Sequence, residues 1–336
     1  MAAFSAALAL LSGAVGAGFA SGREILHFFA AHGAMAGAAA VCALITMAGL
    51  FCRLPVQMER CGCTSLAALC RARFGDRLGH LCGALFFALF AVTGGAMLAA
   101  CAELAALTVP VRGAYALGMA ITLLLAAWLS ARGVPGLAPA GAALLILLPA
   151  LMLRLLALPA GEACFLPAMA PDLPVRAALD GIAYGALNAA MLAGTLPALL
   201  TLAPASRKRA AAMFSAMFGA LLLLGTAVCL SHMPSVLHQP MPFVYLSRAL
   251  GKGGYLLVAA CLYAAAFSTL LAMLLGLRRM TGRAHRAYLP PLCCLIAALT
   301  GFGPLVKSAY PALGALCAAL LALLCLPCEQ KNTAIR

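Results

Sequence analysis

The chain has 336 residues, of which 65% are hydrophobic and 9% are charged, and its formal net charge is +14. A soluble globular domain carries about 25% charged residues, so this composition excludes a water-covered surface of ordinary size. It indicates a protein that is largely surrounded by lipid.

Ten long runs lack Asp, Glu, Lys and Arg, and each is about long enough to cross a bilayer as a helix. They predict ten transmembrane helices, at 3–31, 34–52, 80–107, 115–130, 137–156, 177–202, 210–232, 254–277, 288–304 and 309–326. Between the second and third runs, charged and apolar residues mix, which predicts an amphipathic interfacial helix near 66–74.

The basic residues are distributed unevenly between alternate loops. If the N-terminus is cytoplasmic, 15 of the 22 Lys and Arg residues fall on the inside: Arg53, Arg60, Arg71, Arg73, Arg77, Arg132, Arg207, Lys208, Arg209, Arg278, Arg279, Arg283, Arg286, Lys331 and Arg336. This pattern follows the positive-inside rule and predicts a multi-pass protein of the plasma membrane with both termini cytoplasmic. The positive charge therefore needs no nucleic-acid partner to explain it.

A proline-rich stretch marks the clearest internal boundary. It divides the chain into a first five-helix repeat at 1–158, an extracytoplasmic linker at 159–176, a second five-helix repeat at 177–328 and a short cytoplasmic tail at 329–336. Because five is odd, the second half enters the membrane from the opposite side. Such inverted repeats are common in secondary transporters, so the expected fold is an all-α membrane protein with two inverted halves.

The first predicted helix contains four glycines between Gly13 and Gly22. Each glycine costs a helix about 1 kcal/mol relative to alanine, so this cluster predicts a break. The first helix of the second half is also rich in helix-weakening or polar residues: Gly181, Tyr184, Gly185, Asn188, Gly194 and Pro197. In inverted-repeat transporters the substrate lies where corresponding helices are broken, although glycines in such helices can instead serve close packing.

An unwound segment at membrane depth leaves backbone groups free, and these are tolerated only where they line a cavity or meet a ligand. Free N–H groups favour an anion such as a carboxylate, whereas free carbonyls favour a cation. An amino acid with a coupling cation would satisfy both.

Residues 15–25, Val-Gly-Ala-Gly-Phe-Ala-Ser-Gly-Arg-Glu-Ile, are followed by His-Phe-Phe at 27–29. This opening closely resembles that of the YkvI-like membrane proteins, a branch of the amino acid–polyamine–organocation (APC) transporter superfamily. Shorter matches are Tyr-Gly-Ala-Leu-Asn at 184–188 and Ala-Phe-Ser-Thr at 266–269. The resemblance implies a LeuT-type fold of five plus five inverted helices, with helices 1 and 6 broken.

The resemblance also implies a site. Ala14, Ala17 and Gly18 would lie at the carboxylate of the substrate. The full predicted substrate-binding set is Ala14, Gly16, Ala17, Gly18, Phe19, Ala20, Ser21, Gly22, Tyr184 and Asn188. A Na⁺ would be held by oxygens of Val15, Ala265, Ser268 and Thr269, although Ser and Thr in such helices often bond their own backbone. Many members of the superfamily use protons, so H⁺ is the alternative coupling ion.

Charged residues within predicted spans are functional candidates by default, and two acidic residues are singled out here. Glu24 follows the glycine cluster directly, and Glu103 lies in the third helix. Either could carry a proton or gate the site. The alternatives are that Glu24 pairs with Arg23 and that Glu103 reaches water at the outer end of its helix.

The 15 cysteines do not form a disulfide framework, because most lie within predicted spans. A metal site at Cys61, Cys63 and Cys70 is a weak alternative, since their spacing does not match the usual zinc pairs.

These observations predict a secondary transporter, not an enzyme, that moves a small zwitterionic solute by alternating access, with an amino acid as the expected substrate. No cofactor is expected beyond Na⁺ or H⁺ as coupling ion, and no nucleotide-binding loop of the Gly-xxxx-Gly-Lys-Ser/Thr type occurs. The alternatives are a non-transporting nutrient sensor with a permease fold and an intramembrane enzyme. A sensor would be expected to carry a longer signalling tail, and an enzyme would need an acid–base or metal cluster at one depth.

Overall fold

The computed structural model describes residues 2–108, 111–159, 173–239, 241–301 and 310–326. All regular structure in these residues is helical. The α-helices are α1 (Ala2–Ala14), α2 (Ala17–Ala20), α3 (Arg23–Phe28), α4 (Ala36–Arg60), α5 (Leu66–Thr108), α6 (Ala114–Ala131), α7 (Val134–Leu156), α8 (Leu173–Leu192), α9 (Pro204–Ser231), α10 (Pro242–Ser247), α11 (Gly251–Met280), α12 (Leu289–Ala298) and α14 (Tyr310–Leu324). Short 3₁₀ helices lie at η1 (Ala30–Met35), η2 (Leu196–Thr201), η3 (Arg248–Leu250) and η4 (Arg283–His285).

Six helices in the described residues are long and apolar enough to cross a membrane. The predicted class, an all-α membrane protein, is therefore confirmed. The predicted count of ten spans stays a prediction, because three further apolar helices, including α1, are shorter than a span requires.

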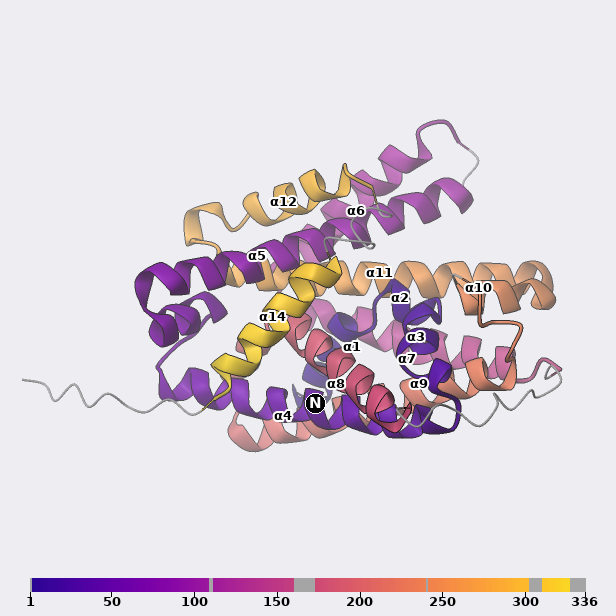
Figure 1. Ribbon diagram of the computed structural model, residues 1–336. Coiled ribbons are helices and arrows are strands. Elements are labelled where there is room, and N and C mark those ends of the chain that lie inside the picture. The colour runs from indigo at the N-terminus through magenta and orange to yellow at the C-terminus, as the bar shows by residue number, and fades with distance from the viewer. Residues whose placement is uncertain (1, 109–110, 160–172, 240, 302–309, 327–336) are drawn as a thin grey trace, which may run out of the picture.

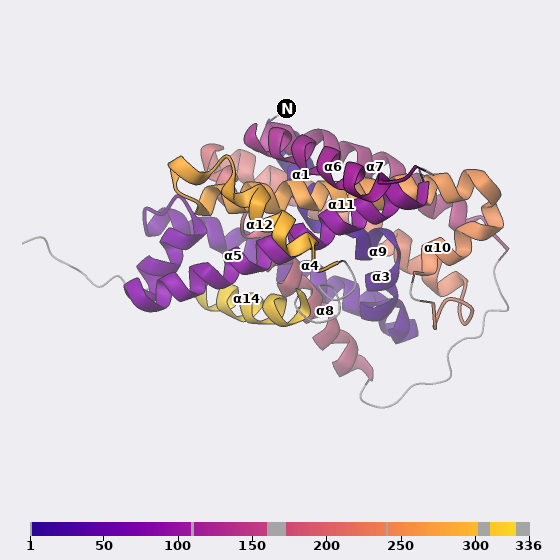
Figure 2. The ribbon, with the colours of Figure 1, turned by 90° about the horizontal axis from the view of Figure 1, so that it is seen from above.

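The helices form an elongated bundle in which α5 and α11 run side by side along the length of the molecule (Figures 1 and 2). Helix α1 lies in the interior, and its residues from Ala6 to Ala14 are all buried. This helix is apolar on every side, which is the pattern of a helix that other helices surround. It packs on α7, α9 and α11, so the segment that follows it begins in the centre of the bundle.

Two predicted helices are joined in the structure. The expected interfacial helix at 66–74 and the third helix at 80–107 make one element, α5, with a sharp bend at Gly75. Gly75 has φ 77°, a left-handed conformation that glycine adopts at little steric cost. The second predicted helix is also longer than expected and continues to Arg60 despite Pro55.

The first helix of the second half differs from its predicted bounds of 177–202. Helix α8 begins at Leu173, inside the stretch predicted to be linker, and ends at Leu192, and 3₁₀ helix η2 follows after a turn. The turn contains Gly194, where an added Cβ would lie 2.9 Å from the Cα of Gly276. The chain thus stops being α-helical where it crosses α11 closely. Most of the predicted linker, residues 160–172, lies outside the described residues.

Two glycines of α8 serve packing. An ideal Cβ on Gly181 would lie 2.2 Å from the carbonyl oxygen of Ala39, and one on Gly185 would lie 2.4 Å from that of Ala43. Glycines four residues apart let two helices approach backbone to backbone, as at other small-residue interfaces in membranes. Gly181 and Gly185 therefore serve close helix packing and do not break the helix.

Substituting Gly185 with Leu is expected to force α8 away from α4, because the clashing atoms belong to a backbone that cannot rotate away. Overpacking of a tight interface costs typically about 1–3 kcal/mol. The unfolding temperature of the protein in detergent should fall clearly. Gly37→Leu, at a position of α4 with nothing within 4 Å of its ideal Cβ, is the matched control and should leave that temperature nearly unchanged.

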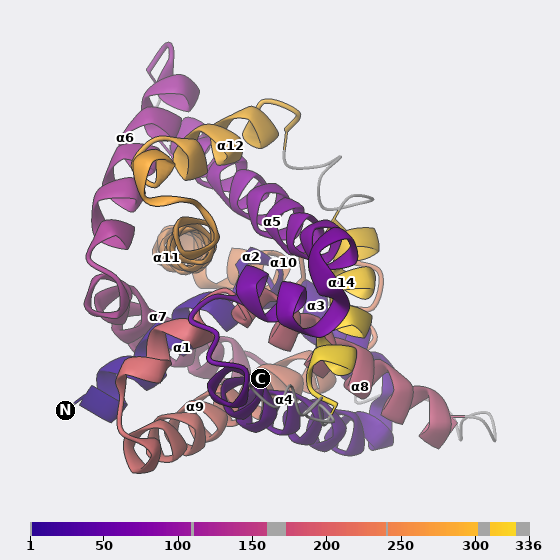
Figure 3. The same ribbon diagram turned by 90° about the vertical axis from the view of Figure 1, so that its left-hand side faces the viewer.

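Several basic residues lie at the end of the bundle where α4 and α11 end and α9 begins. Figure 3 shows the helices from this end. There Arg207 of α9 pairs with Glu59 of α4 at 2.5 Å. Arg278 of α11 donates to Ser130 Oγ at 3.2 Å and to the carbonyl of Ala127 at 2.9 Å, near the last turn of α6. We call this region the basic end.

Candidate functional site

The first helix is interrupted twice in the interior of the protein. Helix α1 ends at Ala14, and Gly16 is extended with φ −92° and ψ −180° before α2 begins at Ala17. A second turn at Ser21 and Gly22 follows, with Gly22 at φ 80°, and α3 begins at Arg23. Because the first N–H groups of a helix have no intrahelical acceptor, each restart presents free donors.

The short helix α10 closes over the second turn. The backbone N–H of Phe243 donates to the carbonyl of Ser21 at 3.0 Å. The Phe243 ring lies where a side chain on Gly22 would project, with Cδ1 2.8 Å from the ideal Cβ. Position 22 therefore requires glycine, both because of its positive φ and because the Phe243 ring leaves no room for a side chain.

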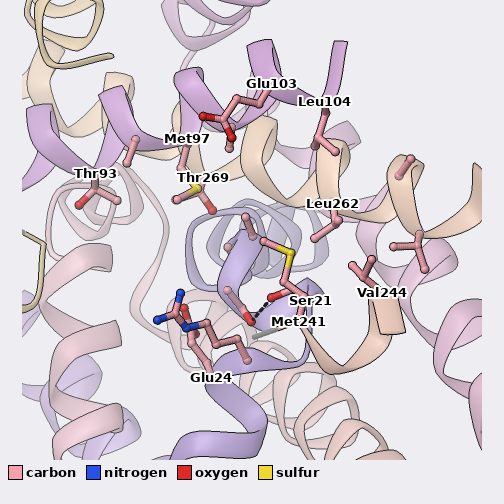
Figure 4. A pocket seen from close by; sticks show the side chains of 18 of the residues that line it. Ser21, Glu24, Thr93, Met97, Glu103, Leu104, Met241, Val244, Leu262 and Thr269 are labelled. Carbon is pink, nitrogen blue, oxygen red and sulfur yellow. Dashed lines mark hydrogen bonds between the residues drawn. The ribbon is translucent and has the colours of Figure 1, made fainter. Parts of the chain in front are cut away.

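A cavity of about 210 Å³ adjoins the interrupted helix. A single water molecule needs roughly 10–15 Å³ on this scale, so the cavity has room for a small organic solute. Its walls come from the ends of α1 to α3 and from α5, α8, α10 and α11 (Figure 4). The lining residues are Ala14, Gly16, Ala17, Gly18, Ser21, Arg23, Glu24, Thr93, Ala96, Met97, Ala100, Glu103, Leu104, Leu107, Asn188, Met191, Met241, Val244, Tyr255, Val258, Ala259, Leu262 and Thr269.

Glu24 folds back over the unwound segment. Its carboxylate occupies the space beside Gly18, where an ideal Cβ would lie 2.2 Å from Glu24 Oε1. Tyr184 of α8 donates its hydroxyl to Glu24 Oε2 at 3.2 Å. The Tyr184 side chain is buried and packs on the rings of Phe28 and Phe29, with centroids 5.1 and 4.9 Å away. The residue thus orients Glu24 from behind the cavity wall.

The residues predicted to hold a cation are close together and pair with one another. Thr269 Oγ1 of α11 donates to the carbonyl of Val15 at 3.1 Å, and Ser268 Oγ donates to the carbonyl of Ala265 at 2.9 Å. Only Thr269 of these four lines the cavity. The Thr269 contact joins α11 to the break between α1 and α2. Ser268 instead bonds the backbone of its own helix, which was the alternative to a role in cation binding.

The predicted substrate-binding residues divide into two groups. Ala14, Gly16, Ala17, Gly18, Ser21 and Asn188 line the cavity, as do Glu24 and Glu103. Phe19, Ala20, Gly22 and Tyr184 lie outside its lining. Phe19 is fully buried and packs on Phe218 at 5.5 Å, because a residue of α2 can face the cavity only on one side of the helix. Asn188 donates to the carbonyl of Tyr184 at 3.0 Å.

Sequence reasoning identified Glu103 of α5 and Thr269 of α11, but it missed the apolar residues of α5, α10 and α11 that complete the cavity wall. Met97, Met241, Val244, Val258 and Leu262 are ordinary apolar residues for a membrane helix, so no local signal marks them. Thr93 of α5 is 1% exposed, and its hydroxyl has no partner among the described residues. A polar residue in an otherwise small and apolar stretch was the available signal for Thr93.

Within the described residues, no group of three or more His, Cys, Asp and Glu side chains is arranged to hold a metal ion. The weak alternative of a site at Cys61, Cys63 and Cys70 therefore gains no support from this part of the chain.

A bundle of apolar helices, with an internally unwound helix beside a central cavity, has the architecture of a membrane transporter. The sequence matches no family model and no curated protein. Solved structures do match: a manganese transporter from Eremococcus coleocola in complex with an aromatic bis-isothiourea substituted compound has a TM-score of 0.60 at 15% identity, covering 96% of this chain and 76% of that one. A histidine-to-alanine mutant of the same transporter gives a TM-score of 0.59 at 16% identity with the same coverage. The chain therefore has the fold of a membrane transporter.

Proposed function

We propose that this protein is a secondary active transporter that binds a small zwitterionic solute, an amino acid, in the cavity beside α2 and α3. The observation that carries the proposal is that one cavity wall combines the restarting helix at Ala17 and Gly18 with Arg23 and Glu24. In this proposal the halves form a LeuT-type 5+5 inverted repeat, and transport follows alternating access.

The cavity offers separate partners for each part of an amino acid. A carboxylate fits the free N–H groups at the start of α2 and the guanidinium of Arg23. An ammonium group fits the carboxylate of Glu24, which Tyr184 holds in place. Met97, Val258 and Leu262 supply an apolar surface for the side chain. The resemblance to the YkvI-like proteins supports the same solute class.

The exposed edge of the cavity supports an orientation. Tyr255, which is 47% exposed, lies near the start of α11, whereas Arg278 and Arg279 lie at its end. The exposed edge is therefore at the opposite end of the bundle from the basic end. With the basic end in the cytoplasm, as the positive-inside rule predicts, this conformation is open to the outside.

The coupling ion is proposed to be Na⁺, bound by the carbonyls of Val15 and Ala265 and the hydroxyls of Ser268 and Thr269. A hydroxyl that now donates to a carbonyl can rotate so that both oxygens face the same cation. Proton coupling through Glu24 is the alternative.

Thr269→Val is expected to abolish the stimulation of uptake by Na⁺, because it removes one oxygen ligand and the hydrogen bond to Val15. Valine has nearly the same shape, so the packing of α11 should persist. Uptake rates measured over a series of Na⁺ concentrations check this prediction. Thr281→Val is the control, because the Thr281 hydroxyl donates to the carbonyl of Leu277 in its own helix and Thr281 does not line the cavity. An unchanged Na⁺ dependence would remove Thr269 from the ion site.

A second candidate substrate is a divalent metal ion, because the solved structures with this fold include manganese transporters. Glu24, Glu103 and Asn188 offer oxygens in the cavity wall, and Met97 and Met191 offer thioethers. Two features favour the zwitterion. The described residues contain no group of three His, Cys, Asp and Glu ligands, and Arg23 places a positive charge in the same wall.

Uptake into liposomes tests the proposal. The purified protein is reconstituted, and the accumulation of a mixture of labelled amino acids is compared with that of Mn²⁺ under an imposed Na⁺ or H⁺ gradient. The proposal expects amino acid accumulation under at least one gradient. Accumulation of Mn²⁺ alone would establish the second candidate, and binding of an amino acid with no flux would establish a non-transporting sensor.

A further inference from the structure

A second cavity, of about 270 Å³, lies at the basic end, away from the proposed substrate site. It lies between the first segment of α5, residues 66–74, and the rest of that helix, which folds back at Gly75. Its lining residues are Ala67, Arg71, Gly79, His80, Gly83, Ala84, Phe87 and Met280.

Small residues let the two segments approach closely. An ideal Cβ on Gly79 would lie 2.4 Å from the Cα of Arg71, so only glycine permits this approach. An ideal Cβ on Gly83 would lie 3.6 Å from the Cβ of Ala67, which is ordinary contact distance. The close crossing brings Arg71 and His80, from the two segments, into the wall of the same cavity.

The one formal charge in the lining of this cavity is positive. Arg71 lines the cavity and no carboxylate does, and His80 adds an imidazole that can donate a hydrogen bond. Neither residue forms an ion pair within the described part of the chain. An unbalanced positive charge near a low-dielectric region attracts an anion.

Exposed apolar residues lie on the same turns of α5 as the cavity. Leu78 and Leu81 are 61% and 59% exposed, and neither lines the cavity. In a protein surrounded by lipid, such residues place these turns of α5 beside acyl chains, so that a lipid headgroup can reach Arg71. Basic pockets at the ends of membrane helices recognise anionic headgroups.

We propose that the cavity between the two segments of α5 binds a phosphate group through Arg71 and His80, and that the phosphate belongs to an anionic lipid headgroup. The bound lipid would hold the folded-back segment 66–74 against α5 and Met280. This site is separate from the substrate site, and it does not depend on what the protein transports.

Thermal unfolding of the purified, detergent-solubilised protein tests the proposal without measuring transport. Phosphatidylglycerol, phosphatidylcholine and inorganic phosphate are each titrated, and the concentration that gives half of the maximal rise in unfolding temperature is recorded. A ligand that binds the folded state raises this temperature. Phosphatidylglycerol should act at lower concentration than phosphatidylcholine, whose headgroup carries a compensating positive charge.

Arg71→Gln is expected to raise the half-effective concentration of phosphatidylglycerol about fivefold, which is the effect of one basic residue near an anionic membrane surface. Arg71→Gln combined with His80→Gln should weaken it further. Arg60→Gln is the matched control, because Arg60 is exposed at the same end but does not line the cavity. It should leave the phosphatidylglycerol titration unchanged.

The outcomes separate the sources of the phosphate. Stabilisation by inorganic phosphate that is lost in Arg71→Gln, without a lipid effect, would keep the phosphate site and assign it to a soluble ligand. Equal effects of Arg71→Gln and Arg60→Gln, or equal stabilisation by both lipids, would overturn the proposal, because the attraction would then be a property of the whole basic end.

Discussion

Substituting Gly18 with Leu is expected to abolish solute uptake while leaving membrane insertion intact. The space beside Gly18 is filled by Glu24, whose Oε1 and Cδ lie 2.2 and 2.8 Å from an ideal Cβ. A leucine there would displace the carboxylate and project into the cavity that we propose for the solute. The variant would lose the placement of the Glu24 carboxylate and part of the space for the solute at the same time. Uptake should therefore fall to the background of empty liposomes.

A graded series makes this prediction specific. Gly18→Ala adds only the Cβ, which the flexible end of Glu24 can avoid by rotating, so uptake should be reduced but measurable. Gly37→Leu introduces the same side chain at an unobstructed position of α4 and should retain full uptake. Full uptake by Gly18→Leu at normal expression would show that the solute does not bind beside α2.

The position of the break in the first helix could be predicted because its cause is local. Glycines at 16, 18 and 22 weaken the helix whatever surrounds them, and the structure shows α1 ending at Ala14 and α3 restarting at Arg23. The predicted substrate role of these residues has not been tested and stays a prediction. What the sequence predicts here is the shape of the backbone.

The glycines of α8 show why the same signal fails elsewhere. Gly181 and Gly185 lie in a continuous helix, and their small size serves the approach of α4. The interruption comes after Leu192 instead, near Gly194 and the crossing with Gly276. A glycine that breaks a helix and one that packs against a neighbour look alike in sequence, because the difference lies in a partner far along the chain.

The far wall of the cavity could not be predicted for a similar reason. Whether Met97 or Leu262 faces the cavity depends on the rotation of α5 and α11 about their axes. Both helices are apolar on nearly all sides, so no amphipathic pattern fixes that rotation in lipid. Tyr184 was predicted to bind the substrate directly. In the structure it does not line the cavity, and it donates a hydrogen bond to Glu24, which does.

Glu24→Gln is expected to weaken or uncouple transport severely, because Glu24 is the carboxylate that faces the unwound segment directly. Glutamine has nearly the same shape, and its amide oxygen can still accept the Tyr184 hydroxyl, so the cavity should keep its form. What the variant removes is the negative charge. Hydrogen bonds to charged groups contribute about 1.5–3 kcal/mol, which corresponds to roughly 10–150-fold in affinity for an ammonium group.

Two assays separate the possible roles of Glu24. If the carboxylate holds the ammonium group of the solute, Glu24→Gln loses both gradient-driven accumulation and the exchange of labelled for unlabelled solute. If it carries a coupling proton, exchange persists, because that reaction needs no net proton movement, and only accumulation under a H⁺ gradient is lost. Glu103→Gln, at an exposed position of the same cavity, should change both assays little. Normal accumulation and exchange in Glu24→Gln would mean that the charge of Glu24 serves neither role, and that the zwitterion is recognised without it.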